Sequence, residues 1–443
     1  MSTMINKYPV LKDKFQIYQG KNVSFVRNLE TSIENNEYEI NESSVDIIKE
    51  CNGMNTFEEI ISNLALTYDR GYAEIKDIIF DFIEDNPIFE INEKPLKIPF
   101  SPIKGSADLQ IPLMFSIELT NYCNYFCKHC YNNSGPKNNE FINMDGLIEF
   151  LDYLKDFNPV IELTGGEPFA HPNIQEIIDY CCRNFGFVKI FTNGSLVKKH
   201  IEFLSKYDNL VLLISVYSYK VEYMNQFTKT KGYFDIVMNN IEKLVKNGVS
   251  VGGDLITTPV NLKDMYLTVK IMKDKGVDFV RMGVIMPIGR AKNKNLDFTS
   301  ENIDEFNKEF ERIAEDFAGF IEKNPEYLLE DMNDKANCGI TTNVLSIKYN
   351  GEVIFCPVVP EDFNIGNVFK ESPESFFKKI AKCNYYQVPA PKKEFCGDCK
   401  EIIFCKGCIS RGLHAQKENH DCIWYEKIFK PLKDPAEKIM KIS

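Results

Sequence analysis

Six short apolar segments alternate with amphipathic segments between residues 112 and 285, and this alternation constrains the fold more than any other feature. The predicted strands are Met114–Leu119, Val160–Leu163, Val188–Phe191, Leu210–Val216, Val251–Ile256 and Phe279–Ile285. The predicted helices between them are Met144–Phe157, Ile174–Asn184, Leu196–Tyr207, Phe234–Asn247 and Lys263–Lys275. Alternating strands and helices form a parallel sheet, because each helix returns the chain to the start of the next strand. Six repeats are too few for an eight-fold barrel, so the sequence predicts an α/β fold with a partial, open (β/α)6 barrel.

Three cysteines follow the first predicted strand directly. Cys123, Cys127 and Cys130 have the spacing Cys-x3-Cys-x2-Cys. Active sites of such folds lie at the carboxyl ends of the strands, which is where this loop begins. Three thiolates can bind three irons of a 4Fe–4S cluster and leave the fourth iron open, as a reactive cluster requires. The alternative for the same cysteines is a zinc site completed by a residue from elsewhere in the chain.

Cysteine usage and charge narrow the class of protein further. The chain has 14 cysteines, five histidines and a net charge of -12. The sequence shows neither a secretory signal nor an apolar run of roughly 18 residues, so we expect a cytoplasmic protein without a membrane span. Disulfides are rare in that compartment, which favours metal binding by the cysteines. The acidic balance argues against a nucleic-acid partner.

The cysteine loop resembles the signature of the radical S-adenosylmethionine (SAM) superfamily. Motifs after the later strands agree: Gly165-Gly166-Glu167-Pro168 resembles the GGEP motif, and Thr192-Asn193-Gly194 resembles the TNG element. The resemblance implies that the cluster binds and cleaves SAM to form a 5′-deoxyadenosyl radical. It implies catalytic roles for Cys123, Cys127, Cys130 and Glu167. It implies SAM contacts for His129, Gly165, Gly166, Glu167, Thr192, Asn193, Ser215, Gly289 and Arg290.

Two details qualify this assignment of residues. The two glycines of the GGEP motif are expected to let the backbone approach the ligand closely. Glu167 is expected to accept a hydrogen bond from the SAM ammonium group. His129 takes the place of an aromatic residue that is usual in the family, and Ser215-Val216-Tyr217-Ser218 departs from the usual SLDS sequence.

Seven cysteines near the C-terminus resemble the SPASM domain, which carries auxiliary 4Fe–4S clusters. The resemblance implies one cluster on Cys396, Cys399, Cys405 and Cys422. It implies a second cluster on Cys338, Cys356 and Cys408, which makes three clusters in the chain. Either Cys383 completes the second cluster, or its open iron binds a substrate thiolate. The alternative for these cysteines is a zinc-ribbon pair. The remainder beyond residue 335 is predicted to have little regular structure.

The N-terminal segment resembles a PqqD-like leader-peptide recognition element with a winged-helix-like fold. Its predicted elements are strands at 23–27, 37–40 and 88–91 and helices at 42–51, 57–68 and 73–85. Modules of this kind bind an extended peptide as an added strand. The predicted organisation is a recognition element at 1–95, a linker at 96–111, a radical SAM barrel at 112–325 and a SPASM domain at 326–443. A helix at 302–323 is predicted to end the barrel.

This order of domains resembles the thioether-forming maturases of sactipeptides and ranthipeptides. It implies an oxidoreductase that joins cysteine sulfur to carbon in a ribosomally synthesised precursor peptide. The expected partners are a cysteine-containing precursor and an electron donor such as flavodoxin or ferredoxin. Carbon–carbon crosslinking, epimerisation and formylglycine formation on a sulfatase are alternatives with the same architecture. A catalytically silent peptide-binding scaffold is the alternative from another class.

Overall fold

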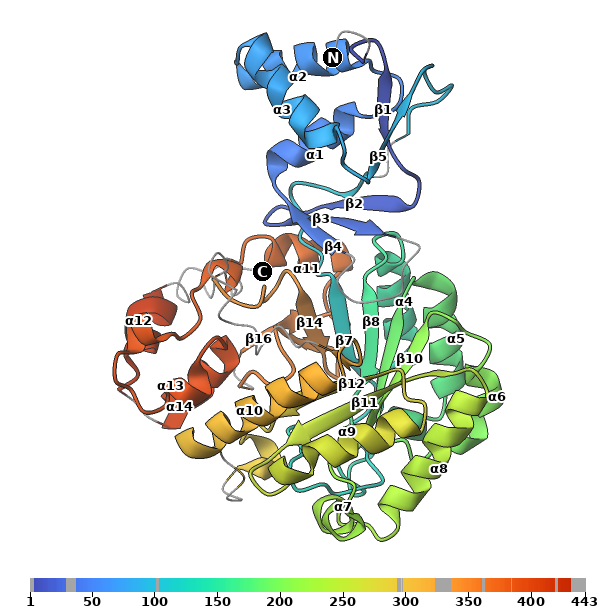
Figure 1. The fold of residues 1–443 in the computed structure, drawn as a ribbon, viewed down its shortest axis with the longest axis vertical. Coiled ribbons are helices and arrows are strands. Elements are labelled where there is room, and N and C mark those ends of the chain that lie inside the picture. The colour runs from blue at the N-terminus through green and yellow to red at the C-terminus, as the bar shows by residue number, and fades with distance from the viewer. Residues whose placement is uncertain are drawn as a thin grey trace. The chain divides into compact units, whose positions relative to one another are not determined.

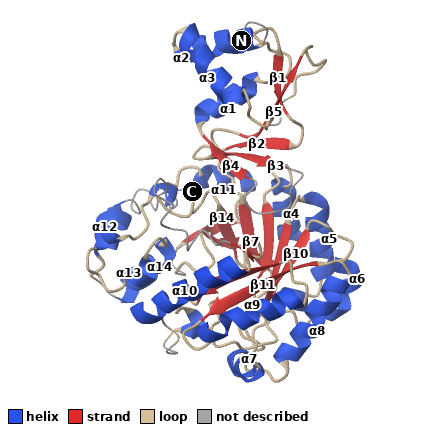
Figure 2. Cartoon of the chain, in the orientation of Figure 1, coloured by secondary structure: helices blue, strands red, loops and turns tan. Residues whose placement is uncertain are grey.

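The chain folds into two compact units, Met1–Ile111 and Pro112–Ser443. The computed structural model describes residues 4–28, 37–100, 103–292, 296, 298–322, 336–360, 363–383, 385–418 and 421–431. Figure 1 shows the course of the chain, and Figure 2 shows its helices and strands. In the part of the chain that the structure describes, no helix is long and apolar enough to cross a membrane.

The second unit is built on one large sheet. Ten strands of the described residues follow the order β13-β12-β11-β10-β9-β8-β7-β14-β15-β16. Its central strands are β7 (Met114–Glu118), β8 (Val160–Thr164), β9 (Val188–Thr192), β10 (Leu210–Ser215), β11 (Ser250–Thr257) and β12 (Phe279–Val284). These six strands are parallel and lie side by side in chain order, which confirms the predicted alternation. The sheet continues past both β7 and β12, so it is open.

Most of the predicted helices are present, with some changes at their ends. They are α4 (Met144–Leu154), α5 (Ile174–Asn184), α6 (Ile201–Leu204), α8 (Tyr233–Lys246) and α9 (Met265–Asp274). A 3₁₀ turn at Val197–His200 precedes α6, so the single helix predicted there is divided. The helix α7 (Val221–Thr228) was not predicted. Figure 1 shows these helices along the outside of the sheet.

The prediction of one helix over 302–323 is wrong at its C-terminal end. The helix α10 (Ser300–Asp316) begins after Thr299, whose side chain accepts a hydrogen bond from the Asn302 backbone. It ends at Phe317, and the chain then forms the short strand β13 (Ile321–Glu322). This strand pairs in parallel with β12. Pairing with a distant strand gives a two-residue segment no periodic signal, so the sequence does not reveal it.

The segment beyond residue 335 has more regular structure than predicted. The strand β14 (Val344–Ile347) pairs in parallel with β7, and β15 (Glu352–Ile354) and β16 (Asn364–Asn367) extend the sheet in antiparallel fashion. Four helices follow: α11 (Pro373–Ile380), α12 (Lys393–Cys396), α13 (Ile402–Cys405) and α14 (Ile409–Glu418). A π-helical turn covers Tyr425–Phe429. The predicted domain boundary at 325 and 326 lies outside the described residues.

The first unit combines two small sheets with three helices. The strands β1 (Tyr8–Leu11) and β5 (Phe89–Asn92) pair with each other. The second sheet has the order β4 (Glu37–Ile40), β3 (Ser24–Asn28), β2 (Phe15–Gln19) and β6 (Ile103–Gly105). The helices are α1 (Glu42–Glu50), α2 (Phe57–Tyr68) and α3 (Tyr72–Ile83), all close to their predicted bounds. The predicted capping box of α2 is present, since Thr56 and Glu59 exchange hydrogen bonds.

The prediction of a linker at 96–111 is wrong for its C-terminal half. Residues 103–105 form β6, which pairs in parallel with β2. The side-chain oxygen of Gln110 accepts hydrogen bonds from the backbone N–H groups of Asn22 and Val23. The Tyr18 hydroxyl accepts one from Ile111. These contacts make the segment part of the first unit, although it is rich in Pro, Lys and Ser. The sequence did not predict them because the partners lie far away along the chain.

Candidate active site

Loops from the carboxyl ends of three strands converge on the cysteine loop after β7. The GGEP segment comes from β8, the TNG segment from β9 and the Gly289-Arg290 segment from β12. Each of them donates backbone or side-chain hydrogen bonds to the segment 120–130. The structure therefore brings together the motifs that the sequence predicted as one site. The individual roles of their residues stay predictions, and the contacts below show what each residue does within the chain.

Gly165 and Gly166 pack against the backbone of the cysteine loop. A Cβ atom on Gly166 would lie 1.9 Å from the carbonyl oxygen of Tyr122, and one on Gly165 would lie 2.6 Å from that of Thr120. The Gly166 N–H also donates to the Thr120 carbonyl at 2.6 Å. Their small size is therefore required by the chain's own backbone, whereas the sequence analysis attributed it to close approach of the ligand.

Glu167 links the GGEP and TNG segments. The side chain is fully buried, and its carboxylate accepts hydrogen bonds from the Thr192 hydroxyl at 2.7 Å and the Asn193 N–H at 2.8 Å. It accepts a third from the Phe169 N–H at 3.1 Å. Burial raises the pKa of Glu167 to about 7, and these donors oppose the shift. The contacts give the carboxylate a positioning role, while its contact with an ammonium group of SAM stays untested.

The TNG segment holds the first half of the cysteine loop. The Asn193 amide donates to the side-chain oxygen of Asn124 at 2.9 Å and lies 3.9 Å from the Cys123 sulfur. Asn124 donates in turn to the Ser195 hydroxyl at 3.0 Å. The Tyr233 hydroxyl from α8 donates to the backbone carbonyls of Asn193 and Ser215. The ends of β9 and β10 are thereby fixed on either side of the loop.

His129 behaves as an aromatic residue. Its ring stacks on Phe227 from α7, with centroids 4.8 Å apart and an interplanar angle of 12°. The Tyr217 ring meets it edge-on at 4.6 Å. Burial, with a smaller contribution from the nearby Arg290, lowers the pKa of His129 to about 3, so the imidazole is neutral at physiological pH. A neutral stacked ring suits the position that is aromatic in most of the family.

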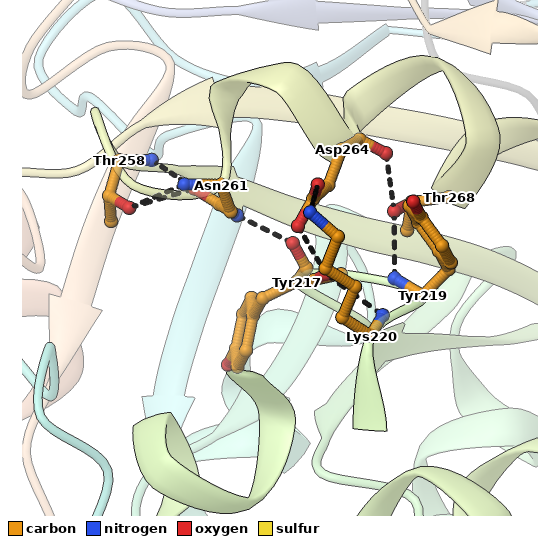
Figure 3. Close-up of polar contacts among 8 residues, drawn as sticks. Tyr217, Tyr219, Lys220, Thr258, Asn261, Asp264 and Thr268 are labelled. Atoms are coloured by element: carbon orange, nitrogen blue, oxygen red, sulfur yellow. Dashed lines mark hydrogen bonds and ion pairs between the residues drawn. The ribbon is translucent and has the colours of Figure 1, made fainter. Parts of the chain in front are cut away.

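A polar network fixes the loop that carries Tyr217 (Figure 3). The Asn261 amide donates to the Tyr217 carbonyl at 2.5 Å, and its oxygen accepts from the Thr258 N–H at 2.6 Å. The Asp264 carboxylate accepts from the Ser218 hydroxyl at 2.7 Å and forms an ion pair with Lys220 at 2.6 Å. The loop after β10 is therefore tied to the loop after β11.

The donor set at the loop fits an iron–sulfur cluster. Burial raises the pKa of Cys123 to about 12, and it raises that of Cys127, with further upward effects from the neighbouring cysteines of the loop. The three thiols therefore lie near enough for their charges to interact. Among the described residues, no three His, Cys, Asp or Glu side chains are arranged to hold a single metal ion. In a cluster the cysteines bind different irons, so such an arrangement is not required.

Four of the C-terminal cysteines also lie near enough for their charges to interact. Burial is the first cause of the raised pKa of Cys405, and Cys422, Cys399 and Cys396 add to it. Cys396 is affected in the same way by Cys399 and Cys422. This grouping agrees with the set that the sequence implied for one auxiliary cluster, although the cluster itself stays a prediction. The second implied set contains an exposed residue, Cys338, and two half-buried residues, Cys356 and Cys408.

Two side chains beside the loop were missed by the sequence analysis. Glu118 ends β7 and is buried, and burial raises its pKa to about 7 against the opposing effects of Lys348 and Asn132. The phenol pKa of Tyr131 is raised well above its usual value by burial, then by Glu118 and Cys130. The sequence offered one signal for each: Glu118 lies at the end of the predicted strand, and Tyr131 follows the third cysteine.

Comparison with known proteins identifies the domain. Residues 117–272 match the radical SAM superfamily. The chain contains a radical SAM domain. The matched residues span β7 to α9 and include the cysteine loop, the GGEP segment and the TNG segment. Membership of this superfamily implies that the domain binds SAM and a 4Fe–4S cluster.

Relatives extend beyond the radical SAM domain. The subtilosin biosynthesis protein AlbA of Bacillus subtilis is 26% identical over 438 residues, which cover 94% of this chain and 96% of AlbA. The sporulation killing factor maturation protein SkfB of the same organism is 28% identical over 205 residues, covering 45% of this chain and 50% of SkfB. The crystal structure of Streptococcus suis SuiB bound to SAM shares the fold, with a TM-score of 0.65 over 92% of this chain and 97% of that chain at 14% identity.

Proposed function

We propose that the protein is a radical SAM maturase that installs thioether crosslinks in a ribosomally synthesised precursor peptide. The observation that carries the proposal is the convergence of the GGEP, TNG and Gly289-Arg290 segments on the loop of Cys123, Cys127 and Cys130. This arrangement occurs in a chain that is similar over 94% of its length to AlbA, which is named for the biosynthesis of the bacteriocin subtilosin.

The cysteine loop would hold the cluster, and the surrounding residues would hold SAM. When bound, the two cofactors would supply the radical chemistry for removing hydrogen from a peptide carbon. Glu167 keeps the strand ends in register through its three hydrogen bonds. Phe227 and Tyr217 pack on the ring of His129 within the loop and contact each other. The chain would therefore contribute position, while the hard chemistry belongs to the cofactors.

A peptide substrate is supported by a solved structure and by relatives that match all or part of this chain. A structure of SuiB bound to its precursor peptide SuiA has a TM-score of 0.66 to this protein. AlbA is named for the biosynthesis of a bacteriocin, and SkfB is named for the maturation of a killing factor. We assign leader-peptide recognition to the first unit, which has the edge strands β4 and β6 in a sheet of four. The open backbone groups of an edge strand suit the addition of a peptide strand.

The thioether product is supported by the C-terminal cysteines. Cys396, Cys399, Cys405 and Cys422 lie together and suit an auxiliary cluster, which would accept the surplus electron when a carbon–sulfur bond forms. Cys338, Cys356 and Cys408 are proposed for a second auxiliary cluster. Carbon–carbon crosslinking, epimerisation and formylglycine formation remain the second candidate class because they use the same architecture.

Mass spectrometry of the modified peptide tests the proposal. A cysteine-containing precursor peptide, chosen from short reading frames beside the gene, is incubated anaerobically with the protein, SAM and dithionite. We expect a loss of two hydrogens per bond, and each bond should protect one cysteine from alkylation. A modified peptide whose thiols all remain free would overturn the thioether assignment and favour the second candidate class. A substitution of Cys123, Cys127 and Cys130 by Ala serves as the control and should abolish the mass change.

A further inference from the structure

Arg290 contacts the cysteine loop through both its backbone and its side chain. Its N–H donates to the Cys130 carbonyl at 3.0 Å, and its Nε donates to the Cys127 carbonyl at 2.8 Å. The guanidinium carbon lies 4.0 Å from the centroid of the Phe126 ring. A Cβ on the preceding Gly289, whose φ is +54°, would meet the Cys130 carbonyl oxygen at 2.5 Å. The segment is therefore fitted closely to the last half of the loop.

One nitrogen of the guanidinium has no partner in the described part of the chain. The Nη1 atom of Arg290 is buried, and the described residues offer it no hydrogen-bond partner. An arginine side chain stays charged at any physiological pH, and a buried donor without a partner is costly. The hydrogen bond from Nε to the Cys127 carbonyl at 2.8 Å holds this charge beside Cys127. These facts point to an acceptor beside Cys127 that the chain itself does not supply.

We propose that Arg290 is a positioning residue that clamps the cysteine loop and places a positive charge beside Cys127, where it raises the reduction potential of the cluster. This inference rests on the proposed function, which assigns the cluster to Cys123, Cys127 and Cys130. The SAM contact that the resemblance implies for Arg290 stays a prediction. Within the chain, its backbone N–H and Nε both donate to the loop backbone.

The physical reason is the charge of the added electron. The cluster gains one electron from a low-potential reductant such as dithionite, so its reduced form is more negative than its oxidised form. A nearby positive charge stabilises the reduced form, and cluster potentials respond to net charge and to hydrogen bonds at sulfur. Arg290 is half-buried, so solvent ions screen its charge less than that of an exposed residue.

Lys229 provides a matched control. Its Nζ lies 5.2 Å from the centroid of the same Phe126 ring, so it is a second cation at the loop. It is exposed, and the structure gives it no hydrogen bond to a loop carbonyl among the described residues. Solvent should screen its charge strongly. Loss of this charge should therefore leave the cluster nearly unaffected.

A redox titration followed by electron paramagnetic resonance tests the inference without measuring catalysis. The reconstituted full-length protein is titrated with dithionite as wild type, Arg290→Gln, Arg290→Lys and Lys229→Gln. The radical SAM cluster is recognised as the reduced signal that changes when SAM is added and that is lost from the triple cysteine-to-Ala variant. At the midpoint potential of the wild type, we expect the ratio of reduced to oxidised cluster to be about tenfold lower in Arg290→Gln. This corresponds to a midpoint lower by about 59 mV for one electron.

The outcomes separate this inference from the proposed function. Lys229→Gln should titrate with the wild type, and an unchanged midpoint in Arg290→Gln at full iron content would overturn the inference. If Arg290→Gln does not retain the cluster, Arg290→Lys provides the test. This variant keeps the charge, so its midpoint should lie near that of the wild type. A tenfold change in its ratio of reduced to oxidised cluster would contradict the electrostatic role. A wild-type protein without any SAM-sensitive signal would instead contradict the proposed function.

Discussion

The substitution Gly166→Ala is predicted to disable the active site through a single methyl group. The added Cβ would lie 1.9 Å from the Tyr122 carbonyl oxygen, whereas the closest ordinary carbon–oxygen contacts are about 3.3 Å. The backbone just before Cys123 must therefore move by roughly 1 Å or more. Such a movement would also disturb the hydrogen bond from Gly166 N–H to Thr120 and that from Glu167 N–H to Tyr122. A misplacement of about 1 Å at a catalytic group costs about 100-fold in rate, or about 2.7 kcal/mol.

The assay is the formation of 5′-deoxyadenosine from SAM with dithionite, measured together with iron content. Gly71→Ala is the matched control, because Gly71 has a φ of -64° and open space where a Cβ would be added. We expect Gly166→Ala to lose about 100-fold of the rate, while Gly71→Ala retains it. A Gly166→Ala protein with wild-type iron content and wild-type rate would refute the view that the glycine is required by the loop backbone.

Three further predictions concern the surrounding residues. Glu167 has a folded pKa of about 7 against an ordinary value of 4.5, so the protonated acid is favoured by the fold and stability is lost as the pH rises through this window. The free energy of unfolding falls by up to about 3 kcal/mol over this window. Urea denaturation of the metal-free protein at pH 5 and 7.5 should show a smaller fall for Glu167→Gln than for the wild type. Equal falls in the two proteins would contradict the buried carboxylate. Cys383 follows α11 and donates to the carbonyl of Lys379 in that helix, at 3.6 Å, so Cys383→Ser should keep the wild-type iron content. Cys405→Ser should lose about four irons. Iron analysis that shows a loss in Cys383→Ser would assign it to a cluster. Asn261→Ala removes the amide that holds Tyr217. The Kd for SAM, measured by calorimetry, should therefore rise about tenfold, which is about 1.4 kcal/mol of binding free energy. An unchanged Kd would show that this network does not support the SAM site.

The parts of the fold that sequence predicted are those with a local signal. The strands β7 to β12 are continuous apolar segments between amphipathic helices, so their order and direction follow from alternation alone. The capping residues Thr56 and Glu59 lie three positions apart, and their exchange of hydrogen bonds depends on nothing farther away. The same holds for the cysteine spacing, because a cluster ligand set can be contained within eight residues.

The parts that sequence missed depend on distant partners. The strand β14 is short and lies beside β7, and β6 lies beside β2, so neither has a period of its own. The contact of Gly166 with the Tyr122 carbonyl could not be predicted, because it joins two loops. The contacts of Arg290 with Cys127 and Cys130 could not be predicted either, because they join the loops after β12 and β7. Motif position identified these residues, while only the folded chain showed what they contact.

The most direct test of the central claim follows a hydrogen atom from the peptide to the cofactor product. The precursor peptide is prepared with uniform carbon-bound deuterium and incubated anaerobically with the protein, SAM and dithionite in ordinary water. If the cluster at Cys123, Cys127 and Cys130 generates a radical that attacks the peptide, 5′-deoxyadenosine should gain one deuterium in proportion to the crosslinks formed. Crosslinked peptide accompanied by 5′-deoxyadenosine without deuterium would contradict the account.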